Sequence, residues 1–160
     1  MSDLLANDVR NMFDRAFATI RGIIEIFPED KWLAPHGDDY YIPSSIAYHI
    51  ASFMDGAVAG GFRDPNFREN LPFGEWHGIT ADKLPGKSAL LEYYIGAEDR
   101  CKKALAGITD ADVTAALPPE MARMGGTQLG AYLGWMREIS DHTGEMNKML
   151  IENGIDDIWK

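Results

Sequence analysis

The sequence predicts an all-α protein, a four-helix bundle whose helices are joined by long connections. Apolar residues recur at steps of three and four along four segments, which is the period of an amphipathic helix. Alternating runs rich in Val, Ile and Thr, which are typical of strands, do not occur in the sequence. The 160 residues fit a single domain over 1–160. Four helices that each carry one apolar face bury those faces most simply in a bundle.

Four segments carry the helical period, and helix start and stop signals bound them. Ser44 or Ser45 is the expected N-cap of the second helix, which Gly60-Gly61 ends, and Thr127 is the expected N-cap of the last. Thr109 begins one short turn of helix between the third and last segments. The four predicted helices span residues 4–27, 44–59, 87–106 and 127–152.

The connection over residues 61–86 is long and contains three prolines and four glycines, with aromatic residues between them. A loop of this length inside a single domain is usually functional, and it predicts a lid that folds over a site. His77 lies in this loop and would reach a site if the loop folds back; a surface histidine is the alternative.

Charge and composition exclude several classes of partner. The net charge is −10, from 25 acidic and 15 basic residues, and it opposes binding to nucleic acid or to an anionic membrane. No stretch of 18 apolar residues predicts a membrane-spanning helix, and the first residues do not resemble a signal peptide. Cys101 is the single cysteine, expected in the core rather than as a nucleophile. We therefore expect a soluble, cytoplasmic protein.

Three residues form the strongest candidate site. Glu138 and His142 lie four residues apart on the last helix, on a shoulder between its apolar and solvent faces, and such a pair can direct two ligand atoms to one ion. His49 occupies the equivalent shoulder of the second helix. If these two helices face one another, two imidazole nitrogens and one carboxylate converge. That set suits zinc, nickel, iron(II) or manganese and leaves coordination positions open.

A Glu-x₃-His spacing also arises by chance on amphipathic helices, so Glu138 could be a solvated carboxylate and His142 a partly buried edge residue. Glu145 lies one turn beyond His142. It is a candidate catalytic base or a partner of the ligand His142, with a solvated glutamate as the alternative.

Two stretches carry a family resemblance. Residues 43–51, Pro-Ser-Ser-Ile-Ala-Tyr-His-Ile-Ala, present a histidine one turn into a helix, and residues 137–147, Arg-Glu-Ile-Ser-Asp-His-Thr-Gly-Glu-Met-Asn, place a ligand four residues before a His-x-Gly-Glu motif. Together they resemble the second-helix and last-helix signatures of the DinB/YfiT-like superfamily. Most members have His at the position of Glu138. The mycothiol-dependent maleylpyruvate isomerases instead use His with Glu-x₃-His, which matches His49, Glu138 and His142.

The resemblance implies a divalent-metal-dependent enzyme, with zinc or nickel held by those three residues. It further implies a transferase or isomerase that acts on a small electrophilic substrate, with a low-molecular-weight thiol such as bacillithiol or mycothiol as co-substrate, in a homodimer. The competing hypothesis is a non-catalytic, metal- or ligand-binding stress-response bundle.

Overall fold

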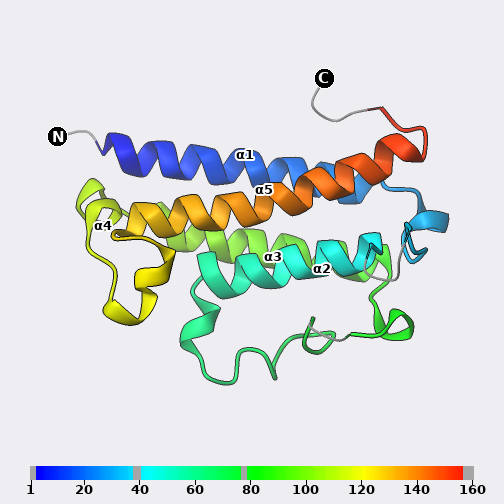
Figure 1. Ribbon diagram of the computed structural model, residues 1–160, viewed down its shortest axis with the longest axis horizontal. Helices are drawn as coiled ribbons and strands as arrows, with labels where there is room; N and C mark the ends of the chain where they lie inside the picture. The colour runs from blue at the N-terminus through cyan, green and yellow to red at the C-terminus, as the bar shows by residue number, and fades with distance from the viewer. Residues whose placement is uncertain (1–2, 38–40, 77–78, 157–160) are drawn as a thin grey trace.

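The computed structural model describes residues 3–37, 41–76 and 79–156, without the side chains of residues 120, 122 and 123. Over these ranges the chain is helical and contains no named strand, so the all-α prediction is confirmed. Four long helices lie side by side along the longest axis, with a short helix near one end (Figure 1). They are α1 (Leu4–Ile26), α2 (Pro43–Phe53), α3 (Lys87–Ala106) and α5 (Gln128–Glu152), and the short helix is α4 (Asp110–Thr114).

Helices α1 and α2 each pack against both α3 and α5. Figure 1 shows that α1 and α5 run in one direction and α2 and α3 in the other. Because α2 and α3 are consecutive and parallel, the chain must return along the whole molecule between them, which accounts for the length of that connection. Among the described residues, no helix has the length and apolar character that a membrane crossing requires.

The core lies where the apolar faces of the helices meet. Phe13 and Phe17 of α1 are fully buried, as the periodicity of that segment predicts. The hydroxyl of Tyr94 on α3 donates to the backbone oxygen of Phe17 at 2.9 Å, so this buried phenol is satisfied. The indole N–H of Trp32 donates to the Pro85 oxygen at 3.0 Å and ties the α1–α2 connection to the start of α3.

The start of α2 differs from the prediction. Pro43 is its first residue and Ile42 is the N-cap, without a side-chain capping bond, so neither Ser44 nor Ser45 is the cap. The Ser44 hydroxyl is buried and donates to the Pro85 oxygen at 2.7 Å. The partner is a distant carbonyl that only the folded chain brings near. By contrast, Thr127 caps α5 and Thr109 caps α4, as predicted.

Helix α2 continues into a π-helical turn, Met54–Val58, before Gly60 ends it at a φ of 87°. Asp55 in this turn is almost fully buried. Its carboxylate accepts two hydrogen bonds from Arg100 of α3, at 2.6 and 2.8 Å, and one from the Tyr93 hydroxyl at 3.2 Å. Cys101 is buried beside it, and burial with the nearby Asp55 charge raises the pKa of the Cys101 thiol to about 12. The expectation of a core cysteine is confirmed.

The Asp55–Arg100 pair should contribute measurably to stability. Arg100→Met leaves a buried carboxylate without its main partner, which we expect to lower the free energy of unfolding by about 1–3 kcal/mol. In an Asp55→Asn background the same substitution should lower the free energy of unfolding by clearly less, because the buried side chain at position 55 then carries no charge. Urea unfolding of the four proteins measures this coupling; equal costs in both backgrounds would contradict it.

Candidate metal centre

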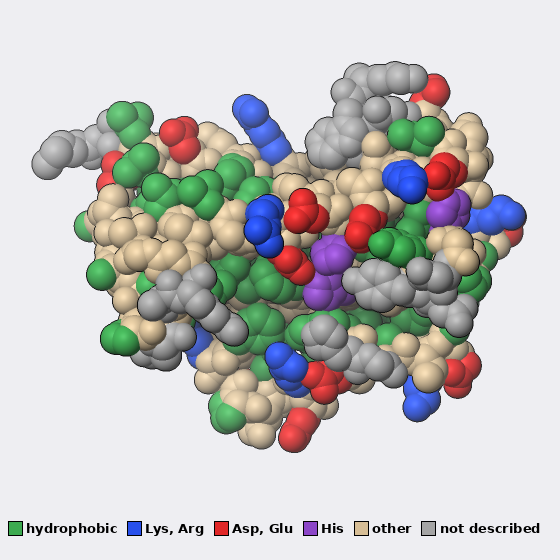
Figure 2. Space-filling model, viewed as in Figure 1, with side chains coloured by type: hydrophobic (Ala, Val, Ile, Leu, Met, Phe, Trp, Pro, Cys, Tyr) green, Lys and Arg blue, Asp and Glu red, His purple; other side chains and the backbone are tan. Residues whose placement is uncertain are grey.

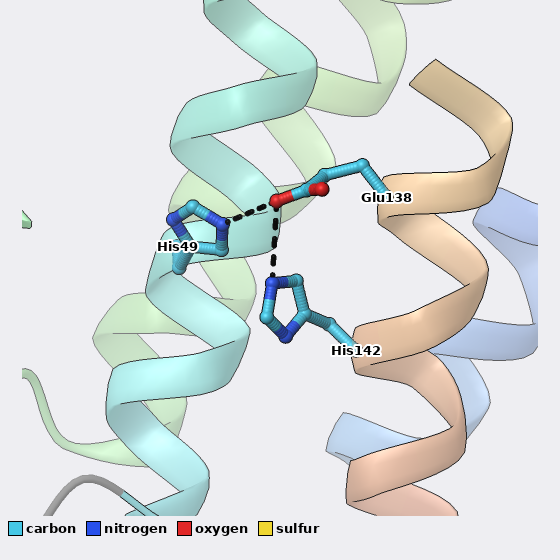
Figure 3. Close-up of side chains that lie close together, drawn as sticks. All are labelled: His49, Glu138 and His142. Carbon is cyan, nitrogen blue, oxygen red and sulfur yellow. Dashed lines mark hydrogen bonds and ion pairs between the residues drawn. The ribbon is translucent and has the colours of Figure 1, made fainter. Parts of the chain in front are cut away.

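The three predicted ligands converge between α2 and α5. His49 projects from α2, Glu138 and His142 project from α5, and their side chains point toward one another (Figure 3). Oε1 of Glu138 lies 3.2 Å from Nε2 of His49 and 3.4 Å from Nε2 of His142. The two imidazole rings meet edge to face, with centroids 4.7 Å apart. The predicted facing of the second and last helices at this site is therefore present in the structure.

Core packing on both helices directs these side chains. Tyr48 and Ile50, the neighbours of His49 in sequence, are buried. On α5, Ile139 follows Glu138 and Thr143 follows His142, and both are buried as well. With its neighbours held in the core, each ligand lies on the shoulder of its helix, at the edge of the solvent. The side chains are 20%, 35% and 14% exposed for His49, Glu138 and His142, so a small molecule can approach them.

The spacing of the ligand atoms suits a divalent metal ion. A tetrahedral ion with ligands at 2.0–2.1 Å requires ligand atoms about 3.3 Å apart, close to the two distances from Oε1 of Glu138. One ligand atom from each of the three residues lies within 4.8 Å of the others. Two imidazoles and one carboxylate form a donor set that zinc and neighbouring divalent metals accept. These residues could therefore hold such an ion.

Glu145 supplies a further constraint. Nδ1 of His142 lies 2.7 Å from Oε2 of Glu145, one turn along α5. A carboxylate only accepts hydrogen bonds, so Nδ1 carries the ring proton. A neutral imidazole has one N–H, which leaves a lone pair on Nε2 facing Oε1 of Glu138. Two acceptors face each other there unless a cation lies between them, either a second proton on the ring or a metal ion.

The environment of Glu138 favours its charged form. Partial burial on its own raises the pKa of this carboxyl, but the hydrogen bond with His49 and the charges of His142 and His49 outweigh burial. The pKa of Glu138 therefore lies below its ordinary value. An ionised carboxylate is the state that binds metal.

The loop after α2 contacts the site through Trp76. The Trp76 ring lies 5.8 Å from the His49 ring and 6.3 Å from the Phe62 ring, between centroids. Arg68 lies over the Trp76 ring and forms an ion pair with Glu75 at 2.6 Å. The sequence predicts a loop over the site but does not single out Trp76 as the contact. The expectation for His77 falls outside the described residues.

The site opens onto one broad face of the molecule. Figure 2 shows histidine side chains at the surface in the middle of this face, beside acidic and hydrophobic side chains. A cavity of about 390 Å³ lies next to it, lined by Glu145, Lys148 and Met149 of α5 and by His36, Gly37 and Tyr41 of the α1–α2 connection. His36 pairs with Glu152 and does not join the three ligands.

Comparison with known proteins adds no assignment, because no family model, curated protein or solved structure matches this chain. The site must therefore be interpreted from its own geometry.

Removal of a ligand tests the metal centre. We expect the purified protein to bind about one equivalent of zinc or nickel, and His142→Ala to lose it, because two ligands seldom retain an ion against dialysis. Isothermal titration with metal followed by elemental analysis measures this. His36→Ala is the matched control and should bind as the parent does; equal binding by His142→Ala would refute the site.

The contact between Glu145 and His142 should tune metal affinity without contributing a ligand atom. We expect Glu145→Met to weaken zinc binding by roughly 10–100-fold, since the ring loses the acceptor that holds its orientation and tautomer. Glu145→Gln keeps an acceptor and should lose less, and Glu152→Gln on the same helix should lose nothing. Competition titrations with a zinc indicator measure the series. An affinity that Glu145→Met leaves unchanged would contradict the role.

Proposed function

We propose that this protein is a divalent-metal-dependent enzyme built on a four-helix bundle of the DinB-like kind, with zinc or nickel held by His49, Glu138 and His142. The observation that carries the proposal is the arrangement around His142. Its ring lies between two carboxylates, with Glu145 on Nδ1 and Glu138 facing Nε2. A cation at Nε2 gives every polar group in this arrangement a complementary partner.

The three residues leave at least one coordination position free in a four-coordinate ion, which separates catalytic from structural sites. When bound, a divalent cation lowers the pKa of a thiol or water in that position and so supplies a nucleophile near neutral pH. The residues of this chain bind and orient the ion. His49, Glu138 and His142 would each supply one ligand atom, and Glu145 holds the His142 ring in position.

The cavity bounded by Glu145, Lys148 and Met149 is the space we assign to the small-molecule substrate. It has the size of a small-ligand site, and Glu145 belongs both to its wall and to the His142 contact. The Lys148 ammonium can attract an anionic substrate group, while Met149 and Tyr41 offer apolar surface. The loop contact at Trp76 borders the site on the His49 side.

The proposed reaction class comes from the family resemblance. We propose transfer of a low-molecular-weight thiol to a small electrophile, or an isomerisation that begins with the same addition. In both, the thiol gives its proton to solvent or to a nearby carboxylate, and its sulfur bonds to an electrophilic carbon. In transfer, an aryl halide then expels its halide, whereas an unsaturated acid opens its C=C bond and takes a proton on the adjacent carbon. In isomerisation, the same addition is followed by rotation about the new C–C single bond and by loss of that proton and the thiolate, which restores the double bond. This class rests on the resemblance of the two helix signatures, and the exposed, open ligand set is compatible with it.

A thiol-transfer assay tests the function. We expect zinc- or nickel-loaded protein to accelerate conjugation of bacillithiol or mycothiol to a reactive aryl halide or an α,β-unsaturated acid, and Glu138→Ala to abolish the acceleration. Lys148→Met should raise KM for the acidic substrate and leave that for the aryl halide unchanged. In the cobalt-substituted protein, added thiol should produce a thiolate-to-metal charge-transfer absorption. Bound metal without that absorption or any turnover would favour the non-catalytic bundle.

A further inference from the structure

A second cavity is lined by residues that follow α2, by the end of α3 and by the first turns of α5. Figure 1 shows these segments toward the same end of the molecule. Its volume is about 480 Å³, within the range of roughly 300–1,000 Å³ that is common for small-ligand sites. None of the three metal ligands lines it. Its wall on α5 is formed by Gln128, Tyr132 and Trp135, one helical turn before Glu138, and Val58 and Leu105 add apolar surface.

The polar groups around this cavity are of both kinds: Arg63 and Trp135 donate, Asp112 accepts, and Gln128 and Tyr132 can do either. The indole Nε1–H of Trp135 is buried and has no hydrogen-bond partner. This nitrogen is closed to solvent, so a ligand in the cavity would contact the Trp135 ring rather than its N–H. Asp112 is the acidic residue in the wall. Its carboxylate accepts from the backbone N–H and the hydroxyl of Thr109, at 2.9 and 2.7 Å, which lowers its pKa, and it forms no ion pair with Arg63.

Arg63 stands out in a chain with a net charge of −10. Its guanidinium lies against Gly60 at the cavity wall, and it forms no ion pair or hydrogen bond with any residue that the structure describes. The Tyr132 hydroxyl is hydrogen-bonded by the Gln128 side chain, and the charges of Asp112 and Arg63 act on it in opposite directions. A guanidinium without an acidic partner, among acidic surroundings, is free to take an anionic group from outside.

We propose that this cavity binds a small organic carboxylate, with its charged end on Arg63 and its apolar body against Trp135 and Val58. The planar fork of a guanidinium matches a carboxylate in geometry. A single arginine and the apolar walls favour a monoanion with a hydrocarbon body over inorganic phosphate. The site goes beyond the proposed metal chemistry, because it uses none of the metal-binding residues and needs no metal.

The test uses the full chain after treatment with a chelator, so that its result does not depend on the metal centre. Benzoate is the probe, benzyl alcohol the neutral comparison and inorganic phosphate the alternative anion. The indole N–H signals of the tryptophans are followed by ¹H–¹⁵N spectroscopy and the Trp135 signal is assigned with Trp135→Phe. We expect benzoate to shift the Trp135 signal in a saturable way and to leave the Trp32 signal in place.

Arg63→Gln should weaken benzoate binding by at least about tenfold, as expected for loss of a charge-assisted hydrogen bond. Arg68→Gln is the matched control, since Arg68 lies in the same loop but is paired with Glu75, and it should bind as the parent does. Three results would overturn the proposal: unchanged affinity in Arg63→Gln, equal binding of benzyl alcohol, or a preference for phosphate. Loss of metal binding in His142→Ala leaves this outcome unaffected, so the two proposals fail separately.

Discussion

One carboxylate oxygen, Oε1 of Glu138, joins the two helices that form the candidate site. It lies within 3.4 Å of imidazole nitrogens from α2 and from α5. A carboxylate and two imidazoles that are partly removed from water stabilise one another little unless the charges among them are balanced. The surrounding core maintains the arrangement, because the residues next to each ligand are packed in the interior. The fold therefore supplies the orientation, and the cation that we propose supplies the charge balance.

The helices can be predicted from the sequence because apolar residues recur every three to four positions within each of them. The period of α1 identifies its buried face, and the Thr109 and Thr127 caps follow from residues within one turn. The prediction of Ser44 as the N-cap of α2 is wrong, although a serine next to a proline satisfies the local rule for a cap. Its true partner, the Pro85 oxygen, lies 41 residues away. Local rules fail where a polar side chain finds a distant partner.

The same distinction applies to the site. Glu138 and His142 could be paired from sequence because four residues place them on one helix face, and Glu145 lies within the same local frame. His49 could be matched to them only through a resemblance or an assumed packing of helices. Arg63 and Trp76 gave no local signal, since their environments depend on how the loop after α2 folds back. Asp55 and Glu98 illustrate the limit further, because both are buried carboxylates whose arginine partners come from other helices.

The choice of a carboxylate at position 138, in place of a third imidazole, has a consequence for chemistry. Two neutral imidazoles and one carboxylate contribute one negative charge, so a divalent cation in the proposed site keeps a net charge of +1 instead of +2. A smaller positive charge would attract a thiolate less strongly, and a less tightly held thiolate would keep more of its nucleophilic character. The smaller charge would also attract competing anions to the open position less strongly. On the proposed function, a ligand set of this composition would favour transfer of a bound nucleophile over its retention. Helix α5 carries two of the three residues, Glu138 and His142, and contributes to the walls of both cavities.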